Sequence, residues 1–212
     1  MESTRLIAVR HGETAWNVDT RIQGQLDIPL NDKGRWQARR AGQALADESI
    51  DAIYSSDLAR AWETAQAIAQ PHALAVTPEV QLRERGFGHF EGRTFREIEA
   101  ELPEQAQRWR TRDPEFAPAG GESLLDLRSR VTQAVAGIAA RHPGQQVVLV
   151  AHGGVMDVLY RAATRQALQA PRSWQLGNAA LNRLLWSPQG LSLVGWGDDA
   201  HLSGESLDET SA

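Results

Sequence analysis

Residues 6–17 read LIAVRHGETAWN, and the abrupt change of character inside this stretch indicates both a fold and the position of a site. The first four residues are apolar, which is typical of a buried strand. The strand ends in Arg10, His11 and Gly12, two polar side chains and the residue type that lets another group approach a backbone most closely. In open parallel sheets, ligands bind in the crevice beyond the carboxyl ends of the strands. The stretch therefore predicts a strand that ends at a binding crevice.

A second strand ends in the same way. Residues 147–151 (VVLVA) are apolar throughout, which favours a central strand covered on both faces, and His152 and Gly153 follow directly. If the two strands are neighbours, both histidines lie at one crevice, each beside a glycine. One histidine at a strand end is most simply a hydrogen-bonded residue of the core. Two histidine–glycine pairs after two apolar strands favour a functional site.

The rest of the chain alternates helices and strands. Periodic apolar residues predict helices over residues 34–48, 58–69, 94–112 and 124–141. The second helix follows the cap cluster Ser55-Ser56-Asp57, and the fourth follows the cap residue Ser123. Pro103 interrupts the third helix. Short apolar runs predict strands over residues 51–54 and 74–77 and a hairpin of residues 181–186 and 191–196. This alternation predicts an α/β fold, a three-layer α/β/α sandwich around a mostly parallel, mixed sheet, with a small helical lobe over the crevice.

The length of 212 residues suits a single domain with a substantial core. We expect this domain to span residues 1–197, with the inserted lobe at about 91–122, where Pro114, Pro118 and two glycines follow a charged helix. From residue 198 onward the sequence is polar and acidic, which predicts a mobile tail over 198–212.

Composition excludes several classes of function. The chain has no cysteine, so it can form neither a disulfide nor a thiolate site, which fits a cytoplasmic protein. Its net charge of −5 argues against a nucleic-acid-binding surface, and it lacks the run of about 18 apolar residues that crosses a membrane. The histidines outside the two pairs show no metal-ligand spacing with one another or with carboxylates, so we expect neither a metal nor a cofactor.

Two further residues add chemistry to the two strand ends. Arg60 lies in the first turn of the helix over 58–69, where free backbone N–H groups already favour an anion, and beside Arg10 it could grip a phosphate bidentately. Glu84 precedes a glycine-rich stretch and could serve as a general acid in a closed pocket. A histidine nucleophile, cationic side chains and a carboxylic acid together describe phosphoryl transfer that needs no metal.

Over nearly all of residues 5–196 the sequence resembles the histidine phosphatase superfamily, the phosphoglycerate-mutase-like family. Five signals carry the resemblance in order: RHGET–WN from residue 10, SSDLARA–ETA from residue 55, LRE–FG–EG from residue 82, GGES from residue 120 and VAHGG from residue 150. RHG alone would be a weak motif, whereas the five together are highly specific.

The resemblance implies a role for each matching residue. His11 would be the phosphorylated nucleophile, and Glu84 the proton donor. Arg10, Arg60 and His152 would form the phosphate pocket. The remaining matches imply contacts with phosphate or substrate at Asn17, Gln23 and Gly153, and similarity to the mutases of the family adds Arg85 and Arg110. Whether the arginines at 108, 110 and 112 instead form a solvated helix face stays open at this point, as does whether Trp109 borders the pocket.

The family contains phosphatases, which transfer the phosphoryl group to water, and mutases, which return it to the substrate. The cofactor-dependent mutases carry a longer insertion before GGES, and a short lobe offers fewer groups to exclude water. We therefore expect a phosphomonoester hydrolase of small phosphorylated metabolites. The alternative is a 2,3-bisphosphoglycerate-dependent phosphoglycerate mutase, and a more distant one is a phosphate-binding module without turnover. The oligomeric state stays open: the terminal hairpin offers an edge strand that could support a homodimer.

Overall fold

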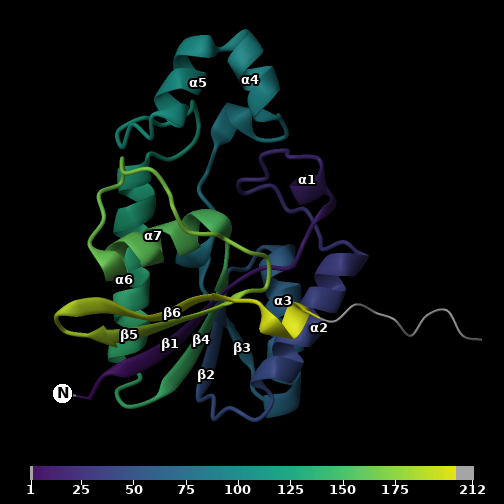
Figure 1. Ribbon diagram of the computed structural model, residues 1–212, viewed down its shortest axis with the longest axis vertical. Coiled ribbons are helices and arrows are strands. Elements are labelled where there is room, and N and C mark those ends of the chain that lie inside the picture. Colours follow the sequence, from purple (N-terminus) through teal and green to yellow (C-terminus); the bar gives the residue numbers. More distant parts are fainter. Residues whose placement is uncertain (1, 204–212) are drawn as a thin grey trace, which may run out of the picture.

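The computed structural model describes residues 2–203, which form a six-stranded mixed sheet in the order β3-β2-β4-β1-β5-β6 (Figure 1). The strands are β1 (Thr4–Arg10), β2 (Ala52–Ser55), β3 (Val76–Pro78), β4 (Gln146–Ala151), β5 (Leu181–Ser187) and β6 (Gly190–Asp198). β1 to β4 run parallel, β5 runs antiparallel to β1, and β6 runs antiparallel to β5. The α/β fold with a mostly parallel, mixed sheet is confirmed.

The two strands that end in histidine are neighbours. β1 and β4 pair in parallel, with Val9 opposite Val150 and Arg10 opposite Ala151. The backbone N–H of His11 donates to the carbonyl of Ala151 over 3.0 Å, so the two strands leave the sheet at the same level. The two histidine–glycine pairs therefore lie at one end of the sheet, as the sequence predicts.

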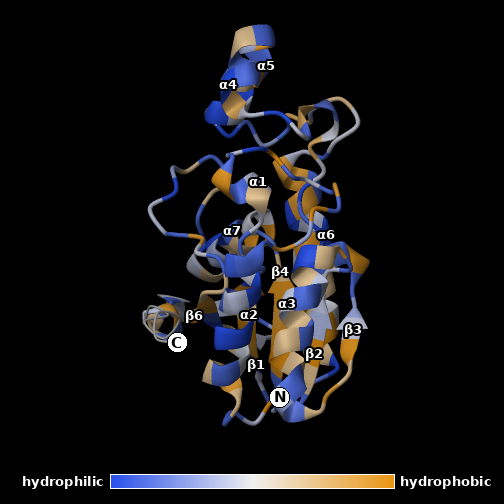
Figure 2. Ribbon diagram, turned by 90° about the vertical axis from the view of Figure 1, so that its right-hand side faces the viewer, coloured by the Kyte–Doolittle hydropathy of each residue, from blue (hydrophilic) through white to orange (hydrophobic). Residues whose placement is uncertain are grey.

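Helices cover both faces of the sheet, and the hydrophobic colouring concentrates between them and the strands (Figures 1 and 2). On one face lie α2 (Asp32–Leu45) and α3 (Ala59–Ala69), and on the other α6 (Leu124–Ala140) and α7 (Gly153–Thr164). Successive residues of β1 point to opposite faces, so Leu6 joins one core and Ile7 the other, each 1% exposed. A strand buried on both faces needs an unbroken apolar run, which β1 and β4 have.

Two helices begin differently from the prediction. The cluster Ser55-Ser56-Asp57 does not cap α3, which begins after Leu58; instead the carboxylate of Asp27 accepts the N–H of Ala59 over 2.7 Å. The sequence did not predict α7, whose first residues are glycines. Here the Glu84 carboxylate accepts the N–H of Gly154. Both helices thus begin on a carboxylate supplied from elsewhere in the chain.

The inserted lobe stands above the ends of the parallel strands (Figure 1). It contains α4 (Phe95–Glu101) and α5 (Pro103–Arg110), with Pro103 at the first position of the second helix. A small separate core of Phe90, Ile98 and Phe116 holds it together. A β-bridge between Arg21 and Thr94 ties it to the segment after α1 (Ala15–Val18).

Short 3-10 turns complete the described chain at Gln70–His72, Val80–Leu82, Gly88–Phe90 and Ala200–Leu202. The last of these corrects the expected start of the tail. Asp198 still belongs to β6, and the carbonyl of His201 accepts the Arg40 guanidinium of α2 over 2.8 Å, so residues 198–203 remain part of the domain. The rest of the expected tail, 204–212, lies outside the described residues. Among residues 2–203, none of the helices combines the length and apolarity needed to cross a membrane.

Candidate active site

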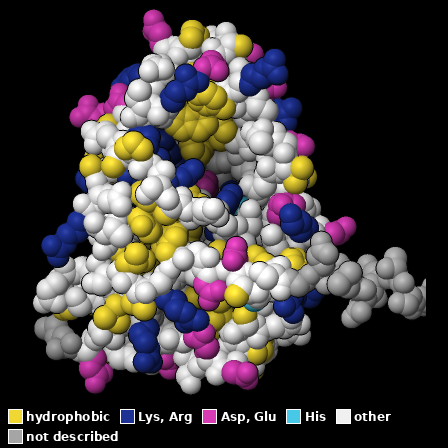
Figure 3. All heavy atoms as spheres, viewed as in Figure 1, with side chains coloured by type: hydrophobic (Ala, Val, Ile, Leu, Met, Phe, Trp, Pro, Cys, Tyr) yellow, Lys and Arg dark blue, Asp and Glu magenta, His cyan; other side chains and the backbone are white. Residues whose placement is uncertain are grey.

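Two adjoining cavities open where the lobe overhangs the strand ends (Figure 3). The smaller, of about 170 Å³, is lined by His11, Arg60, Asn17 and Gln23 among others, and we call it the histidine pocket. The larger, of about 480 Å³, lies beneath the lobe, and we call it the outer cavity. Arg10, Glu84 and Phe87 line both. A ligand can therefore occupy the two cavities at once across the Arg10–Glu84 boundary.

His11 has one protonated and one unprotonated ring nitrogen. Its Nδ1 lies 2.7 Å from the carbonyl oxygen of Gly12, and because a carbonyl can only accept, Nδ1 carries the proton. Burial, followed by the nearby charges of Arg10 and Arg60, holds the pKa of His11 well below its ordinary value. The ring is therefore neutral near pH 7, and its unprotonated Nε2, which accepts a hydrogen bond from Arg60, lies at the histidine pocket.

Arg60 is 1% exposed and held on three sides. Its two terminal nitrogens donate to the carbonyls of Leu26 and Gly24 over 2.8 and 2.7 Å, and its Nε donates to His11 Nε2 over 3.3 Å. Burial lowers its pKa from the ordinary value. The two carbonyls fix the guanidinium beside the histidine before any ligand arrives.

Arg10 adds a second positive charge to the wall of the pocket, and His152 lies beside His11. Arg10 donates to the carbonyl of Leu176 over 2.5 Å, and its Nε is buried without a partner within the described residues. The ring centroids of His11 and His152 are 5.2 Å apart, and His152 Nε2 lies 2.8 Å from the hydroxyl of Ser56. Burial and then Arg60 hold the pKa of His152 well below its ordinary value. The pocket thus concentrates hydrogen-bond donors and positive charge around one neutral nitrogen.

Glu84 sits at the boundary of the two cavities because α7 begins there. Both carboxylate oxygens accept the N–H of Gly154, over 3.1 and 3.0 Å, and Oε1 also accepts the N–H of Arg85 over 2.7 Å. A Cβ atom at Gly154 would lie 2.2 Å from Glu84 Oε1. The second glycine after His152 therefore makes room for this carboxylate.

Arg130 of α6 fixes the backbone around Glu84. Its guanidinium donates to the carbonyls of Gln81, Arg83 and Glu84 over 2.7, 2.8 and 2.9 Å, and it pairs with the carboxylate of Glu122. The GGES segment thus contributes through Glu122, which also accepts the N–H of Gly86 over 2.7 Å. None of this was predicted from the sequence.

Gly12 was expected to let a ligand approach the backbone at the crevice, but the structure gives it a different role. A Cβ atom there would lie 2.3 Å from the carbonyl oxygen of Gly34, so the glycine lets α2 pack against the turn after β1 rather than clearing space for a ligand. The turn is also held by Thr64, whose hydroxyl accepts the N–H of Gly12, and by Asn178, which donates to the carbonyl of His11. Sequence reasoning missed both of these positioning residues.

The structure places Asn17, Gln23 and Gly153 at the cavities. Asn17 and Gln23 line the histidine pocket, and Gly153 lines the outer cavity, where a Cβ atom on it would lie 3.6 Å from Arg10 Nε. The Asn17 side chain also closes the N-terminus of α1 through a reciprocal pair of hydrogen bonds with Thr14.

The two arginines that similarity to the mutases suggested as substrate contacts, Arg85 and Arg110, differ in position. Arg85 lines the outer cavity, but its guanidinium donates to the carbonyls of Glu122 and Phe116, over 2.8 Å each, and burial lowers its pKa to about 10. Arg110 lines neither cavity: its side chain is 52% exposed and paired with Glu99, so the structure does not bring Arg110 to the site. Arg112 lies in the outer cavity in its place, together with Trp109.

The two neutral histidines make the fold sensitive to acid. In the unfolded chain both would take up a proton near pH 6.5, whereas in the folded protein they stay neutral to lower pH, so stability falls as pH decreases below about 6.5. Each contributes a slope of about 1.4 kcal/mol per pH unit while it is neutral in the fold. We expect urea unfolding between pH 7.5 and 5 to show a free energy that falls less steeply in His152→Gln than in the native chain. His89→Gln, in the lobe, is the control, and an equal slope in all three proteins would contradict the prediction.

Comparisons with known proteins agree over almost the whole chain. The family model described as "Histidine phosphatase superfamily (branch 1)" matches residues 6–199. The chain is 38% identical over 206 residues to "Phosphoglycerate mutase-like protein 4" of Arabidopsis thaliana, covering 95% of this chain and 88% of that protein. It is 37% identical over 199 residues to the "Glucosyl-3-phosphoglycerate phosphatase" of Mycobacterium tuberculosis, covering 89% of each.

A similar solved structure is that of a phosphoserine phosphatase from Entamoeba histolytica in complex with 3-phosphoglyceric acid. It superimposes with a TM-score of 0.82 at 28% identity, covering 94% of this chain and 99% of that one. The similarity therefore extends to the lobe and the hairpin as well as to the strand ends.

Proposed function

The chain belongs to the histidine phosphatase superfamily, and on that basis we propose that it hydrolyses phosphomonoesters of small metabolites through a phosphohistidine formed on His11. The observation that carries the proposal is the unprotonated Nε2 of the neutral His11 ring, at a pocket that Arg10 and Arg60 also line. A lone pair held among cations suits attack on a phosphoryl group, whose negative charge would repel an anionic nucleophile.

In the first step, Nε2 of His11 bonds to phosphorus while the bond from phosphorus to the ester oxygen breaks. The electrons of that bond pass to the ester oxygen, which takes a proton from Glu84 and leaves as the alcohol. Arg10 and Arg60 offset the charge on the phosphoryl oxygens, and the Gly12 carbonyl holds the proton on Nδ1. The position of Glu84 between the cavities suits this role, because the alcohol half of the ester would extend past it into the outer cavity.

In the second step, a water molecule attacks the phosphorus of the phosphohistidine. Glu84, now a carboxylate, accepts a proton from the water as the bond between Nε2 and phosphorus breaks. The electrons of that bond return to Nε2, inorganic phosphate leaves, and both residues regain their starting state. The charges that a metal ion would otherwise offset are met by guanidinium groups.

The names of the relatives support hydrolysis, and one of them also supports the alternative of a mutase. Two of them are named phosphatases, one of glucosyl-3-phosphoglycerate and one of phosphoserine, and a third is named mutase-like. Hydrolysis is favoured because the outer cavity, which Glu84 lines, lies in the open hollow beneath the lobe (Figure 3). Water can therefore reach the phosphohistidine. A cytoplasmic location remains a prediction, as does the homodimer that the terminal hairpin could support.

A screen of phosphorylated metabolites in EDTA tests the proposal. We expect phosphate release from p-nitrophenyl phosphate and from a subset of metabolites, unchanged by EDTA because no step uses a metal. Conversion of 3-phosphoglycerate to its 2-isomer with 2,3-bisphosphoglycerate present, at a rate exceeding hydrolysis, would instead establish the mutase. Phosphate binding with no turnover of any ester would leave a binding module.

A further inference from the structure

Ser56 is a buried residue at the strand ends that the chemistry above does not use. It follows β2 directly, is 0% exposed, and does not cap α3, the role expected of the cluster Ser55-Ser56-Asp57. Its backbone N–H donates to the carbonyl of Val150 in β4 over 3.0 Å. Because β4 leads directly into His152, the pairing of β2 with β4 holds the Ser56 hydroxyl at a fixed place beside that ring.

The Ser56 hydroxyl has one hydrogen to donate and one acceptor within reach. Its oxygen accepts the backbone N–H of Leu58 over 3.3 Å, and within residues 2–203 its other partner is Nε2 of His152, 2.8 Å away. A backbone N–H cannot accept, so only the lone pair of Nε2 can take the hydroxyl hydrogen, and the proton of the neutral ring then lies on Nδ1. A proton on Nε2 would instead leave the hydroxyl hydrogen buried without an acceptor, which costs free energy.

Nδ1 of His152 is buried and has no hydrogen-bond partner within the described residues. His152 directly precedes α7, where a side-chain acceptor commonly receives an N–H of the first turn, yet its ring makes no such bond. An unprotonated Nδ1 would therefore gain nothing from the helix. A protonated Nδ1 is a buried donor that awaits an acceptor. The ring of His11 lies beside it, with the two centroids 5.2 Å apart, so a phosphoryl group on His11 would bring oxygen acceptors close.

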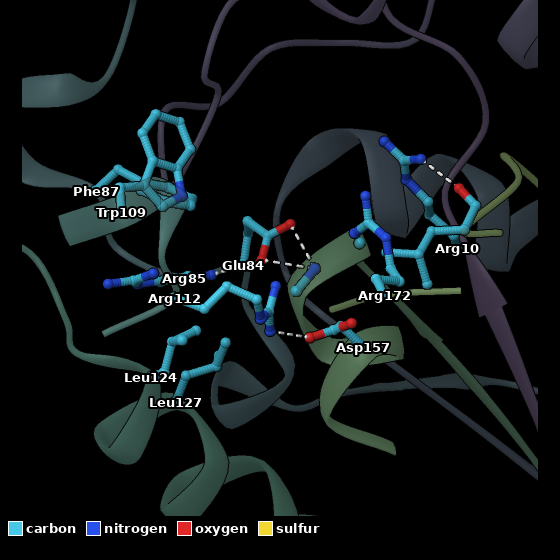
Figure 4. Close-up of a pocket in the computed structure, with 13 residues that line it drawn as sticks. Arg10, Glu84, Arg85, Phe87, Trp109, Arg112, Leu124, Leu127, Asp157 and Arg172 are labelled. Carbon is cyan, nitrogen blue, oxygen red and sulfur yellow. Dashed lines mark hydrogen bonds and ion pairs between the residues drawn. The ribbon is translucent and has the colours of Figure 1, made fainter. Parts of the chain in front are cut away.

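The charges around His152 favour a neutral donor over a cation. Arg10 and Arg60 bring two guanidinium groups to the histidine pocket, and Figure 4 shows the guanidinium of Arg172 beside that of Arg10. A protonated imidazole would add positive charge among them, and burial and then Arg60 hold the pKa of His152 well below its ordinary value. A neutral ring with its proton on Nδ1 offers a phosphoryl oxygen a hydrogen bond without that cost.

We propose that Ser56 is a positioning residue: its hydroxyl donates to Nε2 of His152 and keeps the proton of that ring on Nδ1, where it makes a hydrogen bond to the phosphoryl group. The position of the proton does not depend on the reaction, whereas its effect on turnover rests on the proposed function. His11 also carries its proton on Nδ1, held there by the carbonyl of Gly12. Two rings in the same protonation state thus have opposite tasks, because His11 attacks through its bare Nε2 and His152 donates through Nδ1–H.

Nuclear magnetic resonance of the chain labelled with ¹⁵N-histidine locates the proton without any substrate. At pH 7.5, long-range ¹H–¹⁵N correlations separate a protonated ring nitrogen from a bare one, and His152→Gln identifies the signals of His152 among those of the six histidines. We expect the proton of His152 on Nδ1 in the native chain. In Ser56→Ala, part of the population should carry it on Nε2 instead, the nitrogen that an unconstrained histidine prefers.

Three results would overturn the proposal while leaving the hydrolysis untouched. They are a proton on Nε2 of His152 in the native chain, protons on both nitrogens at this pH, and a Ser56→Ala chain whose proton stays entirely on Nδ1. The first two need no variant, so the proposal can fail even if Ser56→Ala does not fold.

Ser55→Ala is the matched control. Ser55 is also 0% exposed, and its hydroxyl donates to the carbonyl of Ser56 over 2.8 Å rather than to a histidine. Both variants lose one buried hydrogen bond, but Ser55→Ala should keep the native protonation of His152 and the native kcat/KM. A proton shift as large in Ser55→Ala as in Ser56→Ala would reduce Ser56 to a structural role.

Hydrolysis of p-nitrophenyl phosphate measures the consequence for turnover. Ser56→Ala should lower kcat/KM by about tenfold, a loss that one hydrogen bond to a charged group can account for. In the His152→Gln background, an amide N–H replaces Nδ1–H and needs no serine to place its proton, so the same change should cost at most about twofold. Equal losses in the two backgrounds would contradict the role of Ser56 in turnover. If no ester is hydrolysed but Ser56 controls the proton on Nδ1, the proposed function is wrong and the positioning of His152 stands.

Discussion

His11→Ala should lower ester hydrolysis by roughly 10⁴- to 10⁶-fold, because it removes the nitrogen that bonds to phosphorus. The same change should abolish the phosphoenzyme, which is acid-labile since a phosphorus–nitrogen bond is cleaved in acid. Rapid quenching into base followed by intact-protein mass spectrometry detects the added phosphoryl group. In the native chain, a peptide map should place that group on His11.

The control for this variant is His142→Ala. His142 lies just before β4, at the end of the sheet opposite His152, where it contacts Tyr54 and Gln145. We expect this variant to keep both the phosphoenzyme and the hydrolysis rate. A phosphoenzyme that survives in His11→Ala, with circular dichroism confirming the fold, would end the assignment of the nucleophile.

Glu84→Gln should produce a loss that depends on the leaving group. Glutamine keeps an oxygen that can accept the N–H of Gly154 but cannot give a proton to the departing oxygen. For alkyl phosphates, whose alkoxides are strongly basic, we expect the rate of phosphoryl transfer to fall by about 10²- to 10⁴-fold. For p-nitrophenyl phosphate the loss should be much smaller, since p-nitrophenolate leaves without a proton.

A series of aryl and alkyl phosphates measures this directly as the slope of log kcat/KM against the leaving-group pKa. The slope should become steeper in Glu84→Gln. Glu104→Gln, in α5 of the lobe, removes one carboxylate outside both cavities and should leave the slope as it is in the native chain. A parallel loss on every ester in the series would remove Glu84 from the role of proton donor.

The strand ends were predictable because two simple rules meet there. An unbroken apolar run such as VVLVA must be buried on both faces, and parallel neighbours end at one edge of the sheet. If the two strands are neighbours, these rules place His11 and His152 at one edge of the sheet. The pairing of β1 with β4 and the 5.2 Å between the two ring centroids confirm this placement. Ser123 could be predicted as the cap of α6 because its partner, Asp126, lies only three residues away.

Features that depend on distant contacts were not predictable. α3 and α7 begin on carboxylates that lie 32 and 70 residues away along the chain, at Asp27 and Glu84, and no local pattern signals this. Arg112 rather than Arg110 enters the outer cavity because the chain turns left-handed there, with φ of 54° after the end of α5. A non-glycine residue in that conformation gives no sign in the sequence.

The boundary formed by Arg10 and Glu84 divides the protein into two parts that can change independently. The groups around His11 stand on strand and helix ends whose positions the whole sheet determines. Much of the outer wall comes instead from the lobe and the loop between α7 and β5, which carry Trp109, Arg112 and Arg172. Loops accept substitution more readily than the sheet that supports them. Evolution, or a mutant library confined to those two segments, can therefore redirect the choice of ester while the chemistry at the histidine is inherited intact.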